Sequence, residues 1–339
     1  MKHKLIITLL FPAALCVCSC TGFSCTDGRP DTGAHRTAPQ SLRLVSWNTE
    51  TFFDAVKDGT EYSEFKSSKS NWNRDAYIGR LDRLCEVVRT LDADVYAFEE
   101  IENDGIMYDI SNRLAGSAWN SRHSWNYACF AKTPGDATGC AVLSRFPLGA
   151  MTVHSLDIRT SGEQPQMRPI IEVSVYAGSC PLVLFINHWK SKAGGKTETE
   201  TEKWRNWQES VLGKLIAGIP DSAAAACGDF NRDITGFLPG PENGTVLLRY
   251  LCSGCKKETT VVSPWIRSDG TYVKPGSYYF KNRWERIDHF FTAGTASAVD
   301  FAPVTDGPWA DSSGVPAAYT VFTGKGWSDH LPVAATITY

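Results

Sequence analysis

Residues 223–233 (AAAACGDFNRD) constrain the fold of this chain more than any other stretch. Four alanines and a cysteine form a short apolar run that is typical of a buried strand, and the run stops at Gly228. Asp229 and Asn231 follow and lie on the same side of an extended backbone. A carboxylate and an amide in this arrangement can grip a water molecule or a phosphate oxygen. An Asx turn that only closes the strand is the alternative interpretation.

Other apolar runs along the chain also finish on a polar residue suited to phosphate or metal chemistry. Strand ends that meet at one edge of a sheet sandwich would bring such residues together, because rigid elements commonly hold binding and catalytic groups there. Taken singly, each residue also fits a structural role, such as capping a turn or forming a surface ion pair. Taken together, the repeated placement favours a site made of Asn48, Glu100, His188, Asp229, Asp288, Asp329 and His330.

The residue types in this set fit divalent-metal chemistry on a phosphate ester. Asn48 and Glu100 supply the hard oxygen atoms that Mg²⁺, Mn²⁺ or Ca²⁺ prefer. His188 and His330 are suited to donate to phosphate oxygens or to transfer protons near neutral pH. Asp288 would orient one imidazole by accepting the proton of its other nitrogen.

Hydrophobic periodicity places these residues on a series of strands and helices. Apolar residues at three- and four-residue spacings predict a helix over residues 74–91, and further helices are expected over 102–118 and after residue 199. The segment between residues 233 and 284 is expected to be irregular. Strands are predicted over residues 42–47, 94–98, 127–130, 139–143, 170–176, 181–186, 223–227, 284–291 and 331–339. With no repeat or interior linker in evidence, residues 42–339 are expected to form one catalytic domain.

The first residues resemble an export signal. Two lysines give a positively charged start, and residues 5–17 form an apolar run too short to span a bilayer comfortably. The VCSC sequence that follows is typical of a lipoprotein cleavage box, which predicts a signal peptide over residues 1–20, lipidation of Cys20 and a flexible tether over 21–41. An ordinary secretory signal is the alternative. We therefore expect an exported protein anchored to a bacterial membrane, on its periplasmic or cell-surface side.

The cysteines beyond the signal divide into two kinds. Cys85 and Cys227 lie in apolar patterns that favour buried thiols. Cys252 and Cys255 form a single C-x-x-C without a second pair or a nearby histidine, which favours a small local disulfide over a zinc site.

Eight segments of the chain resemble, in order, the endonuclease/exonuclease/phosphatase superfamily, the DNase I-like group. GDFN and SDH at their separation are the most specific pair, and the segments extend over nearly all of residues 42–339. The resemblance implies an α/β fold in the form of a four-layered α/β/β/α sandwich with two central, mainly antiparallel sheets. The segments are SWN (46–48), AFEEIEN (97–103), GCAVLSRFP (139–147), RPIIEV (168–173), INHWKSK (186–192), GDFN (228–231), RID (286–288) and SDHLPV (328–333).

The resemblance also implies a role for each matched position. A divalent cation, Mg²⁺ or Mn²⁺, would be held by Asn48, Glu100 and Asp329. The catalytic residues would be His188, Asp229, Asn231, Asp288 and His330. Substrate phosphate would contact Arg168 and a tyrosine, for which Tyr127 is a candidate and core packing is the alternative. The chain departs from the superfamily pattern at Glu99, where a glutamine is usual.

These observations predict a monomeric, metal-dependent hydrolase of phosphate esters in which water attacks phosphorus in line with the leaving oxygen. A phosphodiester in DNA or RNA is the expected substrate, because INHWKSK resembles the bacterial nuclease-like branch. The net charge of −3 gives no global basic field, so nucleic acid would have to contact a local basic patch, and a solvated helix surface is the alternative explanation of that patch. The candidate patch consists of Lys190, Lys192, Lys196, Lys203 and Arg205.

Two other functions are compatible with parts of this pattern. A phosphomonoesterase or a sphingomyelinase-like phosphodiesterase would use the same residues on another ester. A surface binding protein without catalytic activity would have lost a metal or histidine position, and the sequence retains all of them.

Overall fold

The structure is a computed structural model that describes residues 40–115, 124–156, 164–192 and 198–339. The predicted signal peptide, Cys20 and nearly all of the predicted tether lie outside the described residues. The described residues belong to one compact unit that extends from Pro39 to Tyr339.

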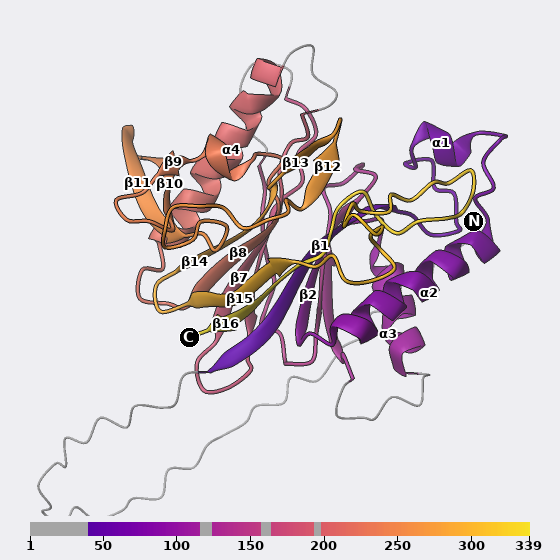
Figure 1. The fold of residues 1–339 in the computed structure, drawn as a ribbon, viewed down its shortest axis with the longest axis horizontal. Coiled ribbons are helices and arrows are strands. Elements are labelled where there is room, and N and C mark those ends of the chain that lie inside the picture. Colours follow the sequence, from indigo (N-terminus) through magenta and orange to yellow (C-terminus); the bar gives the residue numbers. More distant parts are fainter. Residues whose placement is uncertain (1–39, 116–123, 157–163, 193–197) are drawn as a thin grey trace, which may run out of the picture. The chain divides into compact units, whose positions relative to one another are not determined.

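Two large β-sheets occupy the centre of this unit (Figure 1). The first sheet has the order β15-β16-β1-β2-β4-β3 and comprises β1 (Ser41–Phe52), β2 (Val95–Ile101), β3 (Tyr127–Ala131), β4 (Gly139–Ser144), β15 (Ser297–Pro303) and β16 (Val333–Thr338). The second has the order β5-β6-β7-β8-β14-β11-β10-β9 and comprises β5 (Thr152–His154), β6 (Ile170–Val175), β7 (Leu182–His188), β8 (Ala224–Asp229), β9 (Leu238–Pro239), β10 (Thr245–Cys252), β11 (Cys255–Val262) and β14 (Asp288–Ala293). A short hairpin of β12 (Tyr278–Phe280) and β13 (Arg283–Glu285) forms a separate pair.

Most strand pairs in the described residues are antiparallel, and β1–β2 and β7–β8 are parallel. A parallel pair needs a crossover connection, and a helix provides it in both cases. The helix α2 (Arg74–Leu91) connects β1 to β2, and α4 (Glu198–Ala217) connects β7 to β8.

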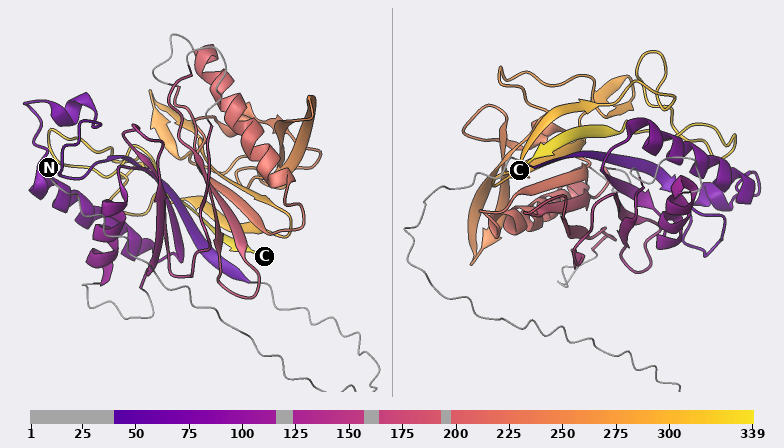
Figure 2. Two further views of the ribbon diagram at one scale, coloured as in Figure 1. Left: turned by 180° about the vertical axis from the view of Figure 1, so that it is seen from behind. Right: turned by 90° about the horizontal axis from the view of Figure 1, so that it is seen from below.

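The helices cover the outer faces of the two sheets. From behind, Figure 2 shows α2 and α3 (Asp104–Ala115) on one side of the sheets and α4 on the other. The remaining helical segments are short, α1 (Ser63–Lys66) and a 3₁₀ turn at Ile234–Gly236. The predicted four-layered α/β/β/α sandwich with mainly antiparallel sheets is therefore confirmed.

The helix α2 spans the residues that the hydrophobic periodicity predicts. Asn73 caps its first turn, because the side-chain oxygen accepts from the backbone N–H groups of Asp75 and Ala76. The helix ends at Leu91, and the C-cap residue Asp92, with a φ of 47°, closes the last turn. Among the described residues, none of the helices has the length and apolar character that crossing a bilayer requires.

Alternate residues of β1 face opposite sides of the first sheet. Leu42 and Leu44 belong to the core between the two sheets, whereas Val45 and Trp47 pack with residues of α2 and α3. Even-numbered residues of this strand therefore face the second sheet. This alternation sends Asn48 toward the second sheet at the end of the strand.

The segment expected to be irregular contains a β-hairpin, so that prediction is wrong. β10 and β11 pair along their full lengths around a turn at Ser253 and Gly254. The sequence does not predict β11, because this strand is mostly exposed and carries no apolar alternation. The strand expected over 284–291 is divided, since β13 ends at Glu285 and β14 begins at Asp288.

Cys252 and Cys255 face each other across the tip of this hairpin, and both are free thiols. The predicted local disulfide is therefore wrong. Positions that flank a two-residue turn exchange backbone hydrogen bonds, and the side chains of such a pair stand farther apart than those of a non-hydrogen-bonded pair. Cys85 and Cys227 are buried, as predicted.

Candidate active site

Strand-end residues predicted from the sequence meet at one end of the sandwich. In the second sheet, His188 at the end of β7 is the register partner of Asp229 at the end of β8, and Asp229 is the partner of Asp288 at the start of β14. Three adjacent strands therefore hold these three residues in a row. In the first sheet, the parallel strands β1 and β2 bring Asn48 and Glu100 to the same end.

The GDFN segment has backbone conformations that suit its residue types. Gly228 has a φ of 129°, and a Cβ atom there would lie 1.9 Å from the carbonyl oxygen of Asn187, so this close approach of β7 and β8 requires glycine. Asn231 has a φ of 48°, which asparagine tolerates better than most residues. Its backbone N–H donates to Asp229 Oδ1 at 2.8 Å and its side-chain amide donates to Oδ2 at 3.0 Å. Asn231 therefore fixes the orientation of Asp229.

Glu100 reaches the site through an irregularity in β2. Ala97 faces the core between the sheets, so regular alternation would turn Glu100 toward the helices. Glu100 instead has a φ of 65°, and the register with both neighbouring strands shifts at this point. Its carboxylate accepts from the backbone N–H of Thr51 at 2.6 Å and lies 3.7 Å from Nε2 of His188.

Asn48 joins the two sheets across the site. Its amide nitrogen donates to Asp229 Oδ2 at 3.1 Å and lies 3.4 Å from Glu100 Oε1. Its amide oxygen accepts from the backbone N–H of Glu50 at 3.0 Å. Asn48 therefore contacts both carboxylates as a donor.

His330 precedes β16 and enters the group from the first sheet. Its Nδ1 donates to Oδ2 of Asp288 at 2.9 Å and lies 3.2 Å from Oδ1. Burial opposes a charge on this imidazole, but Asp288 and Asp329 raise the pKa of His330 well above the ordinary histidine value. His330 is consequently a cation that Asp288 holds in place from the second sheet.

His188 has a different environment. Its Nε2 lies 3.6 Å from Asp229 Oδ2 and 3.7 Å from Glu100 Oε1, beyond hydrogen-bond distance of either. Its Nδ1 is buried and has no hydrogen-bond partner among the described residues. Burial, together with the Arg168 and His330 charges, lowers the pKa of His188 well below the ordinary value. His188 is therefore a neutral imidazole.

Burial disfavours the charged forms of several carboxyls in and beside the group. Burial raises the pKa of Asp229 to about 7, although the His330 charge opposes this rise. Burial and the neighbouring Asp329 carboxylate raise the pKa of Glu50 to about 8. Burial also raises the pKa of Asp329, with Glu100 adding to the effect. A bound cation would favour the charged forms of these carboxyls.

The donor set fits a hard divalent cation. Glu100 offers carboxylate oxygens, and Asp329, with a side chain 36% exposed, offers a further carboxylate at the rim. The amide oxygen of Asn48 is occupied by the backbone of Glu50, so Glu100 is the better-placed of the predicted ligands. A separate acidic group, whose ligand atoms lie within 4.8 Å of one another, is formed by Asp58, Glu61 and Glu102.

Arg168 lies beside the group, whereas Tyr127 does not. Burial opposes the charge of Arg168, but Glu100 is the foremost of the groups that raise its pKa. Tyr127 is paired through β4 with Val95, at the opposite end of β2 from Glu100. The prediction of Tyr127 as a substrate contact is therefore wrong, because the register of β3 places it at the far edge of the first sheet, where it is 39% exposed.

Tyr278 is the aromatic residue that contacts the group, and sequence reasoning missed it. Its ring centroid lies 4.7 Å from that of His330, and burial with the Asp329 charge raises the pKa of Tyr278 to about 12. It comes from the small β12–β13 hairpin, within the segment expected to be irregular. A backbone bridge between Tyr278 and His330 positions the two rings, and no local sequence motif predicts this contact.

Glu99 resolves the departure from the superfamily pattern. Its side chain is fully buried, accepts from Ser46 Oγ at 3.3 Å, and leaves Oε2 without a hydrogen-bond partner among the described residues. Burial, reinforced by Asp288 and Asp229, raises the pKa of Glu99 well above the ordinary value. Glu99 is therefore a neutral carboxyl, close in shape and polarity to the glutamine that is usual at this position.

The predicted basic patch is only partly available to a ligand. Arg205 is buried, and its guanidinium donates to the Lys190 carbonyl and the Thr201 hydroxyl. Lys192 is paired with Glu285 at 2.5 Å. Lys196 lies outside the described residues, and Lys203 is exposed on α4.

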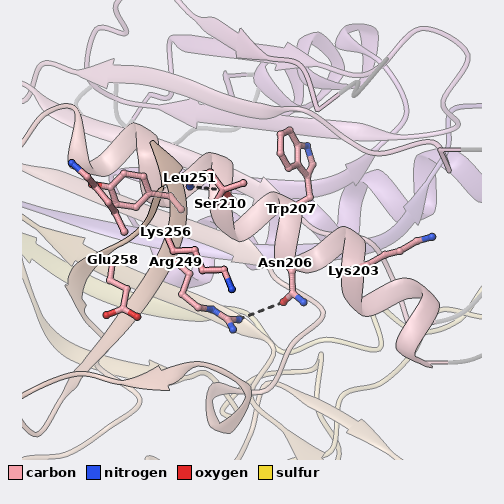
Figure 3. Close-up of a pocket in the computed structure, with 10 residues that line it drawn as sticks. Lys203, Asn206, Trp207, Ser210, Arg249, Leu251, Lys256 and Glu258 are labelled. Carbon is pink, nitrogen blue, oxygen red and sulfur yellow. Dashed lines mark hydrogen bonds between the residues drawn. The ribbon is translucent and has the colours of Figure 1, made fainter. Parts of the chain in front are cut away.

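A hollow of about 640 Å³ lies between α4 and the β10–β11 hairpin (Figure 3). Arg249 and Asn206 are hydrogen-bonded to each other on its wall, and Trp207, Tyr250 and Leu251 give it an apolar component. The charged part of the lining consists of four cationic side chains and one acidic side chain, namely Lys203, Arg249, Lys256, Lys257 and Glu258.

Comparison with known proteins agrees with the geometry. The sequence profile described as the Endonuclease/Exonuclease/phosphatase family matches residues 45–330. No curated protein matches the sequence.

Solved structures share the fold at low sequence identity. A humanized TDP2 from D. rerio superposes with a TM-score of 0.54 at 16% identity, over 88% of this chain and 98% of that chain. A protein of the endonuclease/exonuclease/phosphatase family from Bacteroides thetaiotaomicron gives 0.52 at 16% identity, over 89% of this chain and 99% of that chain. ANGEL2, described as a 2′,3′-cyclic phosphatase, gives 0.53 at 12% identity, over 88% and 95%. At these identities the likeness establishes the fold alone.

Proposed function

Because the chain belongs to the endonuclease/exonuclease/phosphatase family, whose members hydrolyse phosphate esters, we propose that it is a divalent-metal-dependent phosphodiesterase acting on DNA or RNA. One observation carries the proposal. Asp229 and Asn48 meet across the two sheets, between a neutral His188 and a cationic His330. Such a group can accept a proton from water and stabilise negative charge on phosphorus at the same time.

Glu100 would be the principal ligand of the cation, Mg²⁺ or Mn²⁺, with Asn48 and Asp329 beside it. When bound, the cation would supply positive charge opposite the phosphate oxygens and lower the pKa of a coordinated water. Glu100 is suited to this role because the Thr51 N–H fixes one of its oxygens and leaves the other facing His188.

Asp229 would accept the proton of the attacking water. Its pKa of about 7 is poised for this task near neutral pH, and donors from Asn48 and Asn231 hold its carboxylate in one orientation. The two roles are separate, since Asn48 and Asn231 position the base while Asp229 transfers the proton.

The two histidines would bind the phosphate in different ways. His330, a cation paired with Asp288, would face the developing negative charge and donate from Nε2. His188, a neutral imidazole, would offer a hydrogen bond without adding charge. Arg168 would contact a further phosphate oxygen, since it lies close to Glu100.

A polymeric substrate is favoured by the cationic hollow beside α4. Lys203, Lys256 and Lys257 are exposed, and each could neutralise one phosphate of a nucleic-acid strand. Glu209 forms ion pairs with Arg249, which lines the hollow, and with Arg232, which directly follows GDFN. This network of ion pairs connects the hollow to the catalytic segment.

The decisive assay offers the purified protein, with Mg²⁺ or Mn²⁺, a set of esters that separate the candidate functions. The set contains plasmid DNA, RNA, bis(4-nitrophenyl) phosphate, 4-nitrophenyl phosphate and sphingomyelin. The matched control is Asp229→Asn, which keeps the shape of the side chain and removes the base. Cleavage of nucleic acid by the wild type but not by Asp229→Asn supports the proposal. Exclusive cleavage of the monoester or of sphingomyelin would replace it with the corresponding alternative, and no cleavage of any ester would favour a binding protein.

We also propose that the protein acts as an exported monomer attached to a membrane through lipidated Cys20, on the basis of the charged start, the short apolar run and VCSC. Cys20→Ala should move the protein from the membrane fraction to the soluble fraction. Mass spectrometry that finds an unmodified N-terminus elsewhere would contradict the lipid anchor.

A further inference from the structure

Arg80, on α2, is a buried cation whose partners are backbone carbonyls. Its side chain is 2% exposed. The guanidinium donates to the carbonyl oxygens of three consecutive residues, with distances of 2.8 Å to Thr51 and 2.9 Å to Thr49, and it also contacts the carbonyl of Glu50. Arginine suits this position because its planar fork presents several donors in fixed directions.

The three carbonyls belong to a turn that is unfavourable by itself. Glu50 and Thr51 have φ values of 51° and 54°, a region that residues with a Cβ atom rarely adopt. Such residues are strained and persist only where their surroundings hold them. Two in succession direct neighbouring carbonyls toward one point, where Arg80 lies.

Two aromatic rings lie against the guanidinium. Its central carbon lies 3.7 Å from the ring centroid of Tyr319 and 4.8 Å from that of Phe52. The backbone N–H of Tyr319 donates to the Glu50 carboxylate at 2.7 Å. The turn is therefore fixed from both sides, by α2 and by the segment that leads to His330.

The same turn supplies the hydrogen bonds that aim two residues of the site. The Thr51 N–H donates to Glu100 Oε2 at 2.6 Å, and the Glu50 N–H donates to Asn48 Oδ1 at 3.0 Å. If the turn relaxed to ordinary strand geometry, both N–H groups would change direction. Glu100 and Asn48 would then lose the contacts that hold their side chains.

We propose that Arg80 is a positioning residue for the cation site: by holding the Thr49–Thr51 turn, it fixes the directions of Glu100 and Asn48 without touching substrate or cation. The inference rests on the proposed function, which assigns Glu100 and Asn48 as ligands of the cation. Residues that orient metal ligands typically change metal affinity by about 10- to 100-fold when they are replaced.

The test measures Mn²⁺ binding directly, by calorimetry in the absence of substrate. Arg80→Lys keeps the charge but cannot serve three carbonyls, and it should raise the Kd for Mn²⁺ by about 10-fold or more. Hydrolysis at saturating Mn²⁺ should fall much less than hydrolysis at a low Mn²⁺ concentration. That split would not arise from a general loss of folded protein.

Tyr96→Phe is the matched control for destabilisation. The Tyr96 hydroxyl donates to the Val88 carbonyl at the far end of α2 and accepts from the Ala93 N–H, so its loss weakens the same core without reaching the turn. This variant should lower the melting temperature and leave the Kd for Mn²⁺ unchanged. If Arg80→Lys does not fold, Tyr319→Leu removes one ring from the guanidinium, and a 2- to 3-fold higher Kd is expected on the order-of-magnitude scale of such contacts.

The outcomes separate the inference from the function on which it rests. A folded Arg80→Lys variant that binds Mn²⁺ as tightly as the wild type overturns the inference and leaves the function intact. An equal loss of affinity in Tyr96→Phe also overturns it, because the effect would then be general. A wild-type protein that binds no Mn²⁺ and hydrolyses no ester overturns the metal-dependent function and the inference with it.

Discussion

The surroundings of His188 and His330 differ although the two imidazoles belong to the same group. They are similarly buried, with 2% and 5% exposed surface. His330 has a carboxylate at hydrogen-bond distance, Asp288, and is a cation. His188 has its nearest carboxylate oxygens at 3.6 and 3.7 Å and is neutral. Burial acts in the same direction on both, so the neighbouring charges decide the difference. Asp288 and Asp329 favour the cation at His330, whereas the charges of Arg168 and His330 disfavour it at His188.

The two sheets therefore contribute different members of the site. The second sheet provides His188, Asp229 and the counter-ion Asp288 on adjacent strands. The first sheet provides His330, whose charge depends on an acid from the second sheet. His330 is therefore held as a cation only when the two sheets are packed together and Asp288 lies beside it.

Removal of either imidazole should have the largest effect on catalysis. His188→Ala and His330→Ala should each lower kcat by at least ~100-fold, because each removes a donor to the developing charge. The double variant should lose less than the product of the single losses, since both groups act on one transition state. Steady-state kinetics with circular dichroism as the folding control provide the measurement. Near-wild-type turnover in either folded variant, or strictly multiplicative losses, would contradict a shared role.

Neutralising the counter-ion should make His330 resemble His188. Asp288→Asn should reduce kcat/KM by about 10- to 100-fold at pH 8, because the pKa of His330 falls toward or below the ordinary value of about 6.5. The loss should be smaller at pH 6, where a larger fraction of His330 regains its proton. The pH profile of kcat/KM measures this difference.

The exposed Asp306→Asn provides the matched control for that experiment, because it removes the same charge outside the site. Its profile should follow the wild type. A ratio of Asp288→Asn to wild-type activity that does not vary between pH 6 and pH 8 would show that His330 does not titrate there.

The cation should be more closely linked to the surroundings of His188 than to those of His330. Glu100 approaches His188, so Glu100→Gln should raise the metal concentration for half-maximal activity by about 10-fold, as expected for loss of a charged ligand. Chelation should abolish turnover, and Mg²⁺ or Mn²⁺ should restore it. Full activity after exhaustive chelation would eliminate the metal-dependent mechanism.

The sequence predicts this group where an apolar run leads directly into the functional residue. LVLFINH and AAAACGD begin with continuous apolar runs that form buried strands, so His188 and Asp229 could be placed at strand ends from the local sequence. Tyr127 failed for the opposite reason, since the register of β3 depends on its pairing with β4 and not on its own sequence. Tyr278 and Arg80 were missed because their contacts join distant parts of the chain and carry no local motif.

The smallest expected effect is a difference in how the two histidines contribute to stability with pH. The depressed pKa of His188 means that only the unfolded imidazole gains a proton as pH falls through about 6.5, so this residue favours folding more at pH 8 than at pH 6. The raised pKa of His330 gives the opposite sign: its stabilisation is full below about 6.5 and is lost as pH rises toward its folded pKa.

Denaturant unfolding of metal-free protein at pH 6 and pH 8 measures these contributions. Relative to the wild type, His188→Asn and His330→Asn should change the stability difference between the two pH values by on the order of 1 kcal/mol, in opposite directions. Changes of the same sign would mean that the two imidazoles share one charge state.

The last strand of the chain has a consequence for when activity can arise during synthesis. β16 is inserted between β15 and β1, and the Ser328 hydroxyl just before it bonds the Asn48 carbonyl, 280 residues earlier. Pairing over such a separation cannot form until β16 has been synthesised, and until then β1 has only β2 as a neighbour in its sheet. A ribosome-bound chain that already contains His188 and Asp229 still lacks His330. The group that joins His330 to Asp288 and Asp229 is therefore completed only after residues 328–338 have been synthesised and β16 has paired with β1.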